Sequence, residues 1–207
     1  MRERFDEQLT ELGNELIEMG ACCEEAIAAA EKLIDKYDEK LAQTAMELEI
    51  KIDSMERSIE TLCTDMLIRQ QPVAGDFKLI SAAIHMISDM ERIGDMARDI
   101  SDISKLFPHG VIKSVNISEM ASAARKMVTE SVDSFVRRDS ELAGKVIASD
   151  DTVDELFCKV QNEVIDAITA DKSSGEACID LIMIAKYFER IGDHASNIAE
   201  RVIQAVE

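Results

Sequence analysis

The chain has 207 residues, enough for one large domain or two of about 100 residues each. It carries 42 Asp and Glu against 23 Lys and Arg, so its formal net charge is −19. This acidic excess argues against nucleic acid as a partner, because phosphate backbones are bound through Lys and Arg, and against direct docking on an anionic membrane face.

The composition favours an all-helical protein with a sizeable core. Hydrophobic residues make up 46% of the chain, whereas it has only 2 Pro, 8 Gly and no Trp, and sheet proteins need frequent turn residues and aromatic side chains. No stretch approaches the roughly 18 apolar residues of a membrane span. The cysteines are odd in number and lack a CxxC spacing, so we expect no disulfide framework, but core thiols in a cytoplasmic protein. They are Cys22, Cys23, Cys63, Cys158 and Cys178.

Apolar residues recur every three or four positions, the period of an amphipathic helix. The spacing predicts a first helix over residues 5–33, followed by a break at 35–38. A second helix is predicted over 41–66, and Gln71-Pro72 ends it because proline removes a backbone donor. A third helix is predicted from 75 to 106.

The clearest loop signal, Phe107-Pro108-His109-Gly110, lies near the middle of the chain. After it, Asn116 or Ser118 is expected to cap a fourth helix that runs to about Arg137. The predicted organisation is a first three-helix bundle over residues 1–107, a linker over 108–117 and a second bundle over 118–207.

Two further helices complete the second bundle. Asp139 or Ser140 is expected to cap the fifth helix, and the polar segment 171–175 ends it. The sixth helix is predicted from Glu176 to the C-terminus. The predicted fold class is therefore all-α, with six long helices in two similar three-helix bundles.

An internal repeat indicates that the bundles arose by duplication. The pentapeptide Glu-Arg-Ile-Gly-Asp occupies residues 91–95 and recurs identically at 189–193. Upstream, an acid-x-x-x-Asp pattern at 49–53 matches one at 150–154. A glycine inside a helix costs about 1 kcal/mol, so we expect the glycine of each pentapeptide to allow close approach of another helix.

The repeated segments contain pairs of acids four residues apart, which share one helix face. The pairs are Glu49/Asp53, Glu91/Asp95, Asp150/Asp154 and Glu189/Asp193. Like charges at this spacing destabilise a helix, whereas a hard cation such as Mg²⁺, Mn²⁺ or Fe³⁺ bound through oxygen reverses that effect. Exact repetition favours a metal site, since packing alone does not require the same acids twice.

A structural interpretation of these acids stays open. In a chain with 42 acidic residues, pairs at this spacing also arise on solvated faces. Arg98 is placed to neutralise the first cluster by an ordinary salt bridge, although Ser196 stands at the equivalent position in the second half. His194 follows an acid of the second cluster and is interpreted as a solvated or packed residue. No nucleotide-binding glycine motif, Glu-x-x-His pair or nucleophile–base constellation is present.

The sequence Arg69-Gln70-Gln71-Pro72-Val73-Ala74-Gly75-Asp76, together with the two pentapeptides and the segment His194-Ala195-Ser196-Asn197-Ile198-Ala199-Glu200, resembles the PhoU family. The resemblance covers essentially the whole chain. It implies a cytoplasmic, non-enzymatic negative regulator that couples a phosphate ABC transporter to a sensor histidine kinase. The implied partners are the transporter's ATP-binding subunit, the kinase and a second copy of the chain in a homodimer.

The resemblance also implies metal binding through the repeated acids. The implied ligands are Glu49, Asp53, Glu91, Asp95 and Asp99 in the first half, and Asp150, Asp154, Glu189, Asp193 and Asn197 in the second. The ions expected are iron, zinc, manganese or magnesium. The family pattern has Asn where this chain has Asp99, so the first site carries one extra negative charge.

Two classes of function follow from these observations. In the first, the chain is a regulatory adaptor whose acidic faces dock on basic surfaces of its partners. In the second, it is a metal store or a metal-dependent enzyme, which needs a substrate pocket and a base near the carboxylates. The resemblance favours the adaptor.

Overall fold

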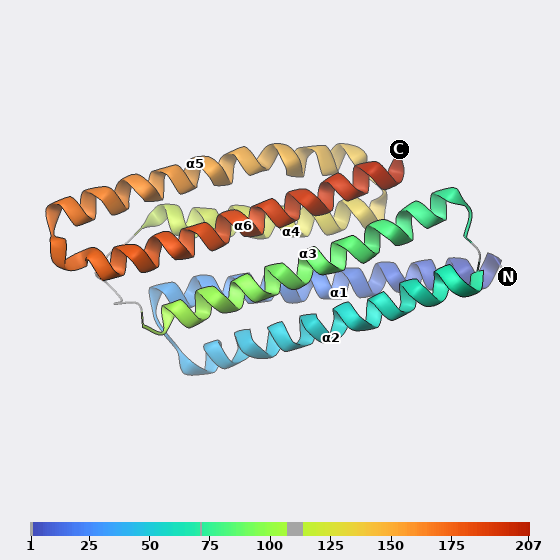
Figure 1. Ribbon diagram of the computed structural model, residues 1–207, viewed down its shortest axis with the longest axis horizontal. Helices are drawn as coiled ribbons and strands as arrows, with labels where there is room; N and C mark the ends of the chain where they lie inside the picture. The colour runs from blue at the N-terminus through green and yellow to red at the C-terminus, as the bar shows by residue number, and fades with distance from the viewer. Residues whose placement is uncertain (1, 71, 107–113) are drawn as a thin grey trace.

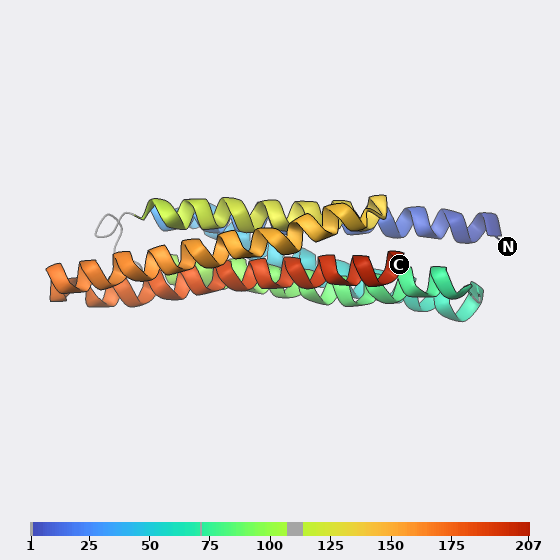
Figure 2. The same cartoon turned by 90° about the horizontal axis from the view of Figure 1, so that it is seen from above.

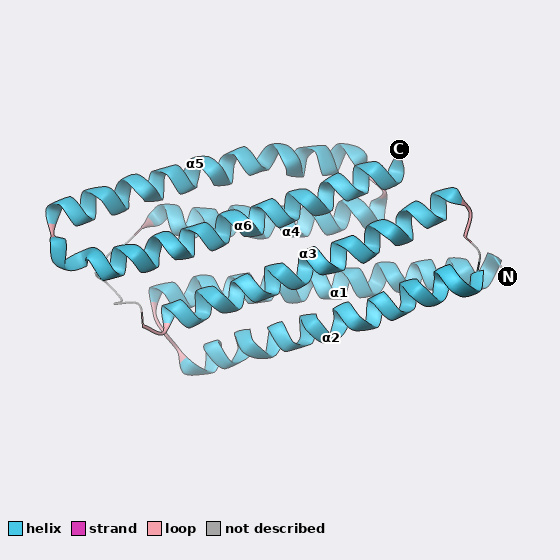
Figure 3. Cartoon of the chain, in the orientation of Figure 1, coloured by secondary structure: helices cyan, strands magenta, loops and turns pink. Residues whose placement is uncertain are grey.

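The computed structural model describes residues 2–70, 72–106 and 114–207. All regular structure in these ranges is helical, as Figure 3 shows. The elements are α1 (Arg2–Asp35), α2 (Glu39–Gln70), α3 (Ala74–Ser104), α4 (Val115–Arg137), α5 (Ser140–Ala170), the short 3-10 helix η1 (Lys172–Ser174) and α6 (Gly175–Val206). The predicted all-α class is confirmed. Within the same ranges, none of the helices combines the length and the apolar character that crossing a bilayer requires.

Each half of the chain is a three-helix bundle in which every helix contacts the other two. The first bundle is α1, α2 and α3, and the second is α4, α5 and α6 (Figure 1). The bundles join along two seams, α3 against α6 and α1 against α4. Figure 1 shows α3 and α6 running in opposite directions, and Figure 2 shows α1 and α4 together on one side of the molecule.

Most helix boundaries follow the sequence signals. The breaks predicted at 35–38 and 171–175 are confirmed, and the carboxylate of Asp38 accepts hydrogen bonds from the backbone N–H groups of residues 40 and 41. The Asp139 side chain accepts from the Leu142 backbone N–H at 2.9 Å and so caps α5, as predicted. Each cap satisfies donors that the first helical turn leaves free.

The cap predicted for the fourth helix was wrong. Ser114, not Asn116 or Ser118, accepts a hydrogen bond from the Ile117 backbone N–H and begins α4. Asn116 instead donates to a carboxylate oxygen of Glu163 on α5, so its amide is used between helices. Residues 115–117 of the predicted linker are therefore helical, and residues 107–113, which carry the Pro-Gly loop signal, lie outside the described residues. The domain division at 1–107 and 118–207 stays a prediction.

The core runs continuously through both bundles. Fully buried side chains include Leu16 and Ile52 in the first half and Val153 and Phe188 in the second. Four of the cysteines are buried as predicted, and burial raises the pKa of the Cys63 thiol to about 12, so it packs as a protonated hydrophobe. Cys158 is exposed, which corrects the prediction for that residue.

The repeated glycines lie where two helices approach closely, as the sequence predicts. A Cβ atom added at Gly94 on α3 would stand 3.0 Å from the Cδ1 atom of Ile52 on α2. At Gly192 on α6 it would stand 3.2 Å from an Asp150 side-chain oxygen and 3.6 Å from a Val153 methyl on α5. Each glycine therefore brings one pair of repeated acids close to the other.

Substituting these glycines tests the close approach. Gly94→Ala is expected to destabilise the protein by about 1–3 kcal/mol, because the added methyl overpacks the Ile52 contact. Gly144→Ala is the matched control, since Gly144 lies inside α5 with nothing within 4 Å of its Cβ position. That substitution is expected to stabilise by about 1 kcal/mol through helix propensity. Urea unfolding of both variants measures the difference, and equal gains in stability would contradict a close approach at Gly94.

Candidate metal centres

Three carboxylates of the first bundle converge at the contact between α2 and α3. One side-chain oxygen from each of Glu49, Asp53 and Asp95 lies within 4.8 Å of the other two. Glu49 and Asp53 share one face of α2, one turn apart, and Asp95 follows Gly94 at its contact with α2. The close approach of the helices therefore assembles the three acids.

Glu49 is the most buried acid of this group, with 8% of its surface exposed. Its Oε1 atom accepts a hydrogen bond from the Arg98 Nη1 group at 3.0 Å. Its Oε2 atom is buried and has no hydrogen-bond partner among the described residues. A buried carboxylate oxygen without a hydrogen-bond partner destabilises the fold. The Glu49 Oε2 atom is therefore available to coordinate a cation.

Glu91, the fourth acid predicted for this site, lies at its edge. Burial raises the pKa of Glu91, and the charge of Asp95 raises it further, whereas Arg92 lowers it. The Arg92 guanidinium pairs with Glu91 at 3.4 Å and with Asp95 at 3.2 Å. Ion pairs with Arg92 and Arg98 thus neutralise part of the charge of these acids, in partial agreement with the salt-bridge interpretation.

The donor set fits a hard cation. All three donors are carboxylates, the ligand type of Mg²⁺ and Mn²⁺. A bound cation would also satisfy the orphan Glu49 oxygen and remove the repulsion between Asp53 and Asp95.

The acids of the second bundle are coupled but more widely spaced. Burial raises the pKa of Asp150 to about 6, helped by the charges of Asp193 and Asp154. Burial also raises the pKa of Asp193, to which the Glu189 charge contributes. The Glu189 carboxylate pairs with Lys186 at 2.6 Å. Across residues 114–207, no three acids meet as closely as in the first bundle.

The raised pKa of Asp150 predicts a pH-dependent stability. The folded protein holds a proton on Asp150 more tightly than the unfolded chain does, so stability falls as the pH rises from about 4 to 6. Asp150→Asn removes this penalty. We expect the metal-free variant to gain about 1 kcal/mol at about pH 7, after solvent screening at this partly exposed site, and nothing at about pH 4.

Urea unfolding in a chelator at the two pH values measures this gain. Asp151→Asn is the matched control, because Asp151 is the exposed neighbour on the same helix. A gain that is independent of pH, or one that Asp151→Asn reproduces, would show that Asp150 does not carry the penalty.

Comparison with known proteins identifies the family. The sequence matches the PhoU domain model twice, over residues 16–104 and 117–202, which fall on the two bundles. The chain belongs to the PhoU family. A phosphate-specific transport system accessory protein PhoU homolog from Clostridium acetobutylicum is 32% identical, over 99% of this chain and 95% of its own length. The homolog from Aquifex aeolicus is 35% identical, over 88% of this chain and 84% of its own length.

Solved PhoU structures have the same fold. The crystal structure of PhoU from Pseudomonas aeruginosa aligns with a TM-score of 0.90 at 33% identity, covering 98% of each chain. PhoU from Streptococcus pneumoniae aligns with a TM-score of 0.89 at 21% identity, covering 97% of this chain and 96% of its own. The predicted pair of similar three-helix bundles is confirmed. The PhoU relatives are named as accessory or regulatory proteins.

The remaining predicted ligands, Asp99 and Asn197, lie at the surface. Asp99 is exposed, and its charge contributes to a raised pKa of Tyr187 on α6, for which burial is the first cause. Asn197 is also exposed. The sequence leaves His194 as either a solvated or a packed residue. In the structure it is half-buried, and its Nδ1 atom lies 2.8 Å from an Asp89 side-chain oxygen on α3. Sequence spacing gives no signal for this contact between bundles.

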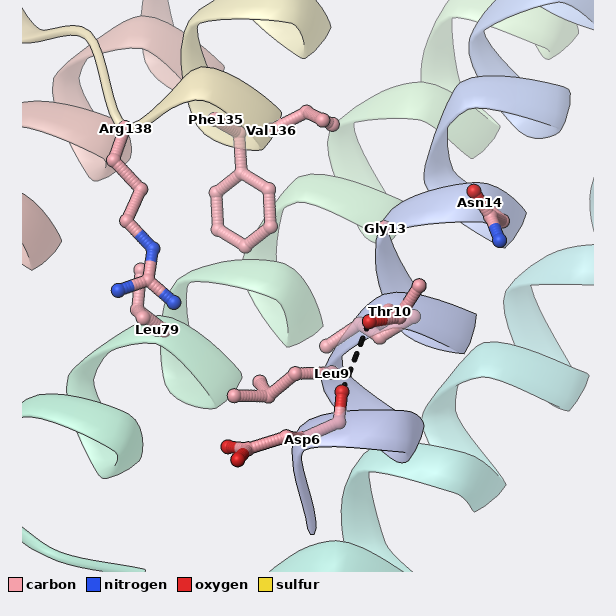
Figure 4. A pocket seen from close by; sticks show the side chains of 10 residues that line it. Asp6, Leu9, Thr10, Gly13, Asn14, Leu79, Phe135, Val136 and Arg138 are labelled. Carbon is pink, nitrogen blue, oxygen red and sulfur yellow. Dashed lines mark hydrogen bonds between the residues drawn. The ribbon is translucent and has the colours of Figure 1, made fainter. Parts of the chain in front are cut away.

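A cavity of about 400 Å³ lies apart from the acidic clusters, between α1, the start of α3 and the end of α4. Figure 4 shows Leu9, Leu79 and Phe135 around it, with Asp6 and Arg138 at its polar side. The dashed line in the figure is the hydrogen bond from the Thr10 hydroxyl to a backbone carbonyl. None of the repeated acids lines this cavity, so the converging carboxylates and the cavity are separate features.

Proposed function

We propose that this chain is a cytoplasmic regulator of phosphate uptake and phosphate-responsive signalling. In this role it is a non-catalytic adaptor and negative regulator that couples a phosphate ABC transporter to a sensor histidine kinase. The observation that carries the proposal is similarity over nearly the full length to accessory proteins of phosphate-specific transport systems. The match spans 95% of the length of the Clostridium acetobutylicum relative and 98% of the Pseudomonas aeruginosa chain.

The proposal includes a metal centre in the first bundle. Glu49, Asp53 and Asp95 would hold the cation, with Glu91 at the edge, and the bound ion would supply positive charge that compensates the acids. Convergence of the three carboxylates and the orphan oxygen of Glu49 support this assignment. The all-oxygen donors favour magnesium, manganese or iron over zinc, which binds nitrogen and sulfur more readily.

We propose a second, weaker centre in the second bundle. Its donors would be Asp150, Asp154, Glu189 and Asp193. Their proximity is supported by the charges of the other three acids, which help to raise the pKa of Asp150, and by those of Glu189 and Asp154, which help to raise the pKa of Asp193. Asp99 and Asn197 lie one turn beyond Asp95 and Asp193 on α3 and α6, so they would act only at the outer edge of the two centres.

The acidic surface is the proposed means of partner recognition. The net charge of −19 favours partners with basic surfaces, since charge complementarity mainly sets the rate of encounter and the choice of partner. We propose the transporter's ATP-binding subunit and the kinase as these partners, and a homodimer as the working form.

Copurification tests the proposed function. The immobilised protein is expected to retain the ATP-binding subunit of the phosphate transporter and the sensor kinase at low salt, and to lose most of both at high salt. The ATP-binding subunit of an unrelated ABC transporter serves as the control. Equal retention of the unrelated subunit, or no retention of either phosphate-system protein, would overturn the proposal.

A further inference from the structure

A small basic pocket lies at one end of the α3–α6 seam. It has a volume of about 200 Å³ and is formed by the start of α3 and the end of α6, which meet at the right of Figure 1. Lys78, Ser81 and His85 line it from α3, and Arg201 and Gln204 line it from α6. No carboxylate is among its lining residues, although the chain carries 42 acids.

The basic side chains of this pocket have no acidic partner. Within the described ranges, neither Lys78 nor His85 forms an ion pair, and Arg201 donates a hydrogen bond from Nη1 only to the neutral Gln204 side chain, at 3.3 Å. Most other basic side chains on the long helices are paired with carboxylates, as Arg57, Arg92 and Lys145 are. The pocket therefore gathers positive charge that the protein itself leaves uncompensated.

Comparison of the two repeats shows that packing does not require these basic side chains. At the position 98 residues away in the other repeat, Lys78 corresponds to Glu176, His85 to Met183, and Arg201 to Ile103. The three equivalent positions are thus apolar or acidic, with Met183 44% exposed. Since the fold forms without basic residues at these positions, Lys78, His85 and Arg201 are explained by a ligand better than by packing.

We propose that this pocket binds a small inorganic oxyanion of the phosphate or sulfate type. Arg and Lys form charge-assisted hydrogen bonds to such anions, and the Ser81 hydroxyl and the Gln204 amide add neutral donors. The volume is below the range of about 300–1,000 Å³ that is typical of cofactor and drug-sized ligands, which limits the ligand to a small ion. At physiological salt the Debye length is about 8 Å, so acidic residues farther than this from the pocket are largely screened from an anion bound in it. The proposal does not depend on the regulatory role proposed above.

Titration with inorganic phosphate, followed by NMR of the histidine side chains, tests the site. The chain has 3 His, so the imidazole signals can be assigned individually with His85→Gln. At constant pH and ionic strength, with chloride as the balancing salt, the His85 signals are expected to shift saturably. The His194 signals are expected to stay unchanged, since His194 is paired with Asp89 in another part of the seam.

Two variants decide whether the lining cations cause the shift. Lys78→Gln/Arg201→Gln is expected to raise the Kd for phosphate by about tenfold, a loss of about 1.4 kcal/mol of binding free energy. Lys159→Gln/Lys172→Gln removes the same formal charge from exposed positions on α5 and η1 and is expected to leave the Kd unchanged. The proposal is overturned by a His85 signal that does not shift, or by equal Kd values in the two variants.

Discussion

Manganese added to the metal-free protein is expected to raise the free energy of unfolding by about 2.7 kcal/mol when the free ion is at about 100 times its Kd. The physical reason is that the ion binds the converged Glu49, Asp53 and Asp95 carboxylates only in the folded state. Asp53→Asn/Asp95→Asn is expected to abolish this gain, because two of the three charged donors are lost. Urea unfolding with Mn²⁺ and with a chelator measures both effects.

Without metal, the same substitutions are expected not to lower the stability of the protein. In a chelator, Asp53→Asn/Asp95→Asn is expected to be at least as stable as the wild type. Neutral side chains remove the repulsion between the acids, and the lost ion pairs with Arg57 and Arg92 are solvent-exposed and contribute little. The matched control is Glu7→Gln/Glu11→Gln, which neutralises two exposed acids one turn apart on α1. The metal interpretation fails if manganese stabilises Asp53→Asn/Asp95→Asn as much as it stabilises this control.

Truncating Phe188 is expected to have the largest effect on the fold. Phe188 is fully buried on α6, the helix that packs against α3, α4 and α5. Phe188→Ala is expected to lower the free energy of unfolding by about 3–5 kcal/mol, through lost burial and the cavity left behind. Phe77→Ala, at a residue that is 52% exposed, is expected to cost about 0.5 kcal/mol.

The Phe188 variant also tests whether the bundles form one cooperative unit. The core continues through both bundles, so denaturant unfolding of wild type and variant is expected to show a single transition. Two separate transitions, or a loss as small as that in Phe77→Ala, would contradict a shared core centred on α6.

The sequence predicts the fold well because helical periodicity is a local property. Apolar spacing of three and four places the six helices, and the identical pentapeptides indicate a duplication. The close helix contacts at Gly94 and Gly192 are also predictable from the sequence, because a glycine inside a long helix is unfavourable unless packing requires it. The cap at Ser114 was missed because several polar residues near this helix start are able to cap it.

The candidate site is predicted only in part, because contacts between helices depend on their packing. Sequence spacing places Glu49 and Asp53 on one face of a helix. It does not show that a third acid, Asp95, approaches them in the first bundle, whereas no three acids of the described second bundle meet as closely. The Arg98 pairing with Glu49 was anticipated as a neutralising salt bridge, whereas the orphan Glu49 oxygen depends on rotamers. The Asp89 contact with His194 joins residues 105 positions apart and has no local signal.

Metal content measured directly after equilibrium dialysis against Mn²⁺ is the decisive test of the proposed first centre. Element analysis of wild type, Asp53→Asn/Asp95→Asn and Glu7→Gln/Glu11→Gln gives the ions bound per chain. The proposed centre predicts a fall of about one equivalent in Asp53→Asn/Asp95→Asn and no change in the control. Wild-type metal content in Asp53→Asn/Asp95→Asn would contradict a centre formed by Glu49, Asp53 and Asp95.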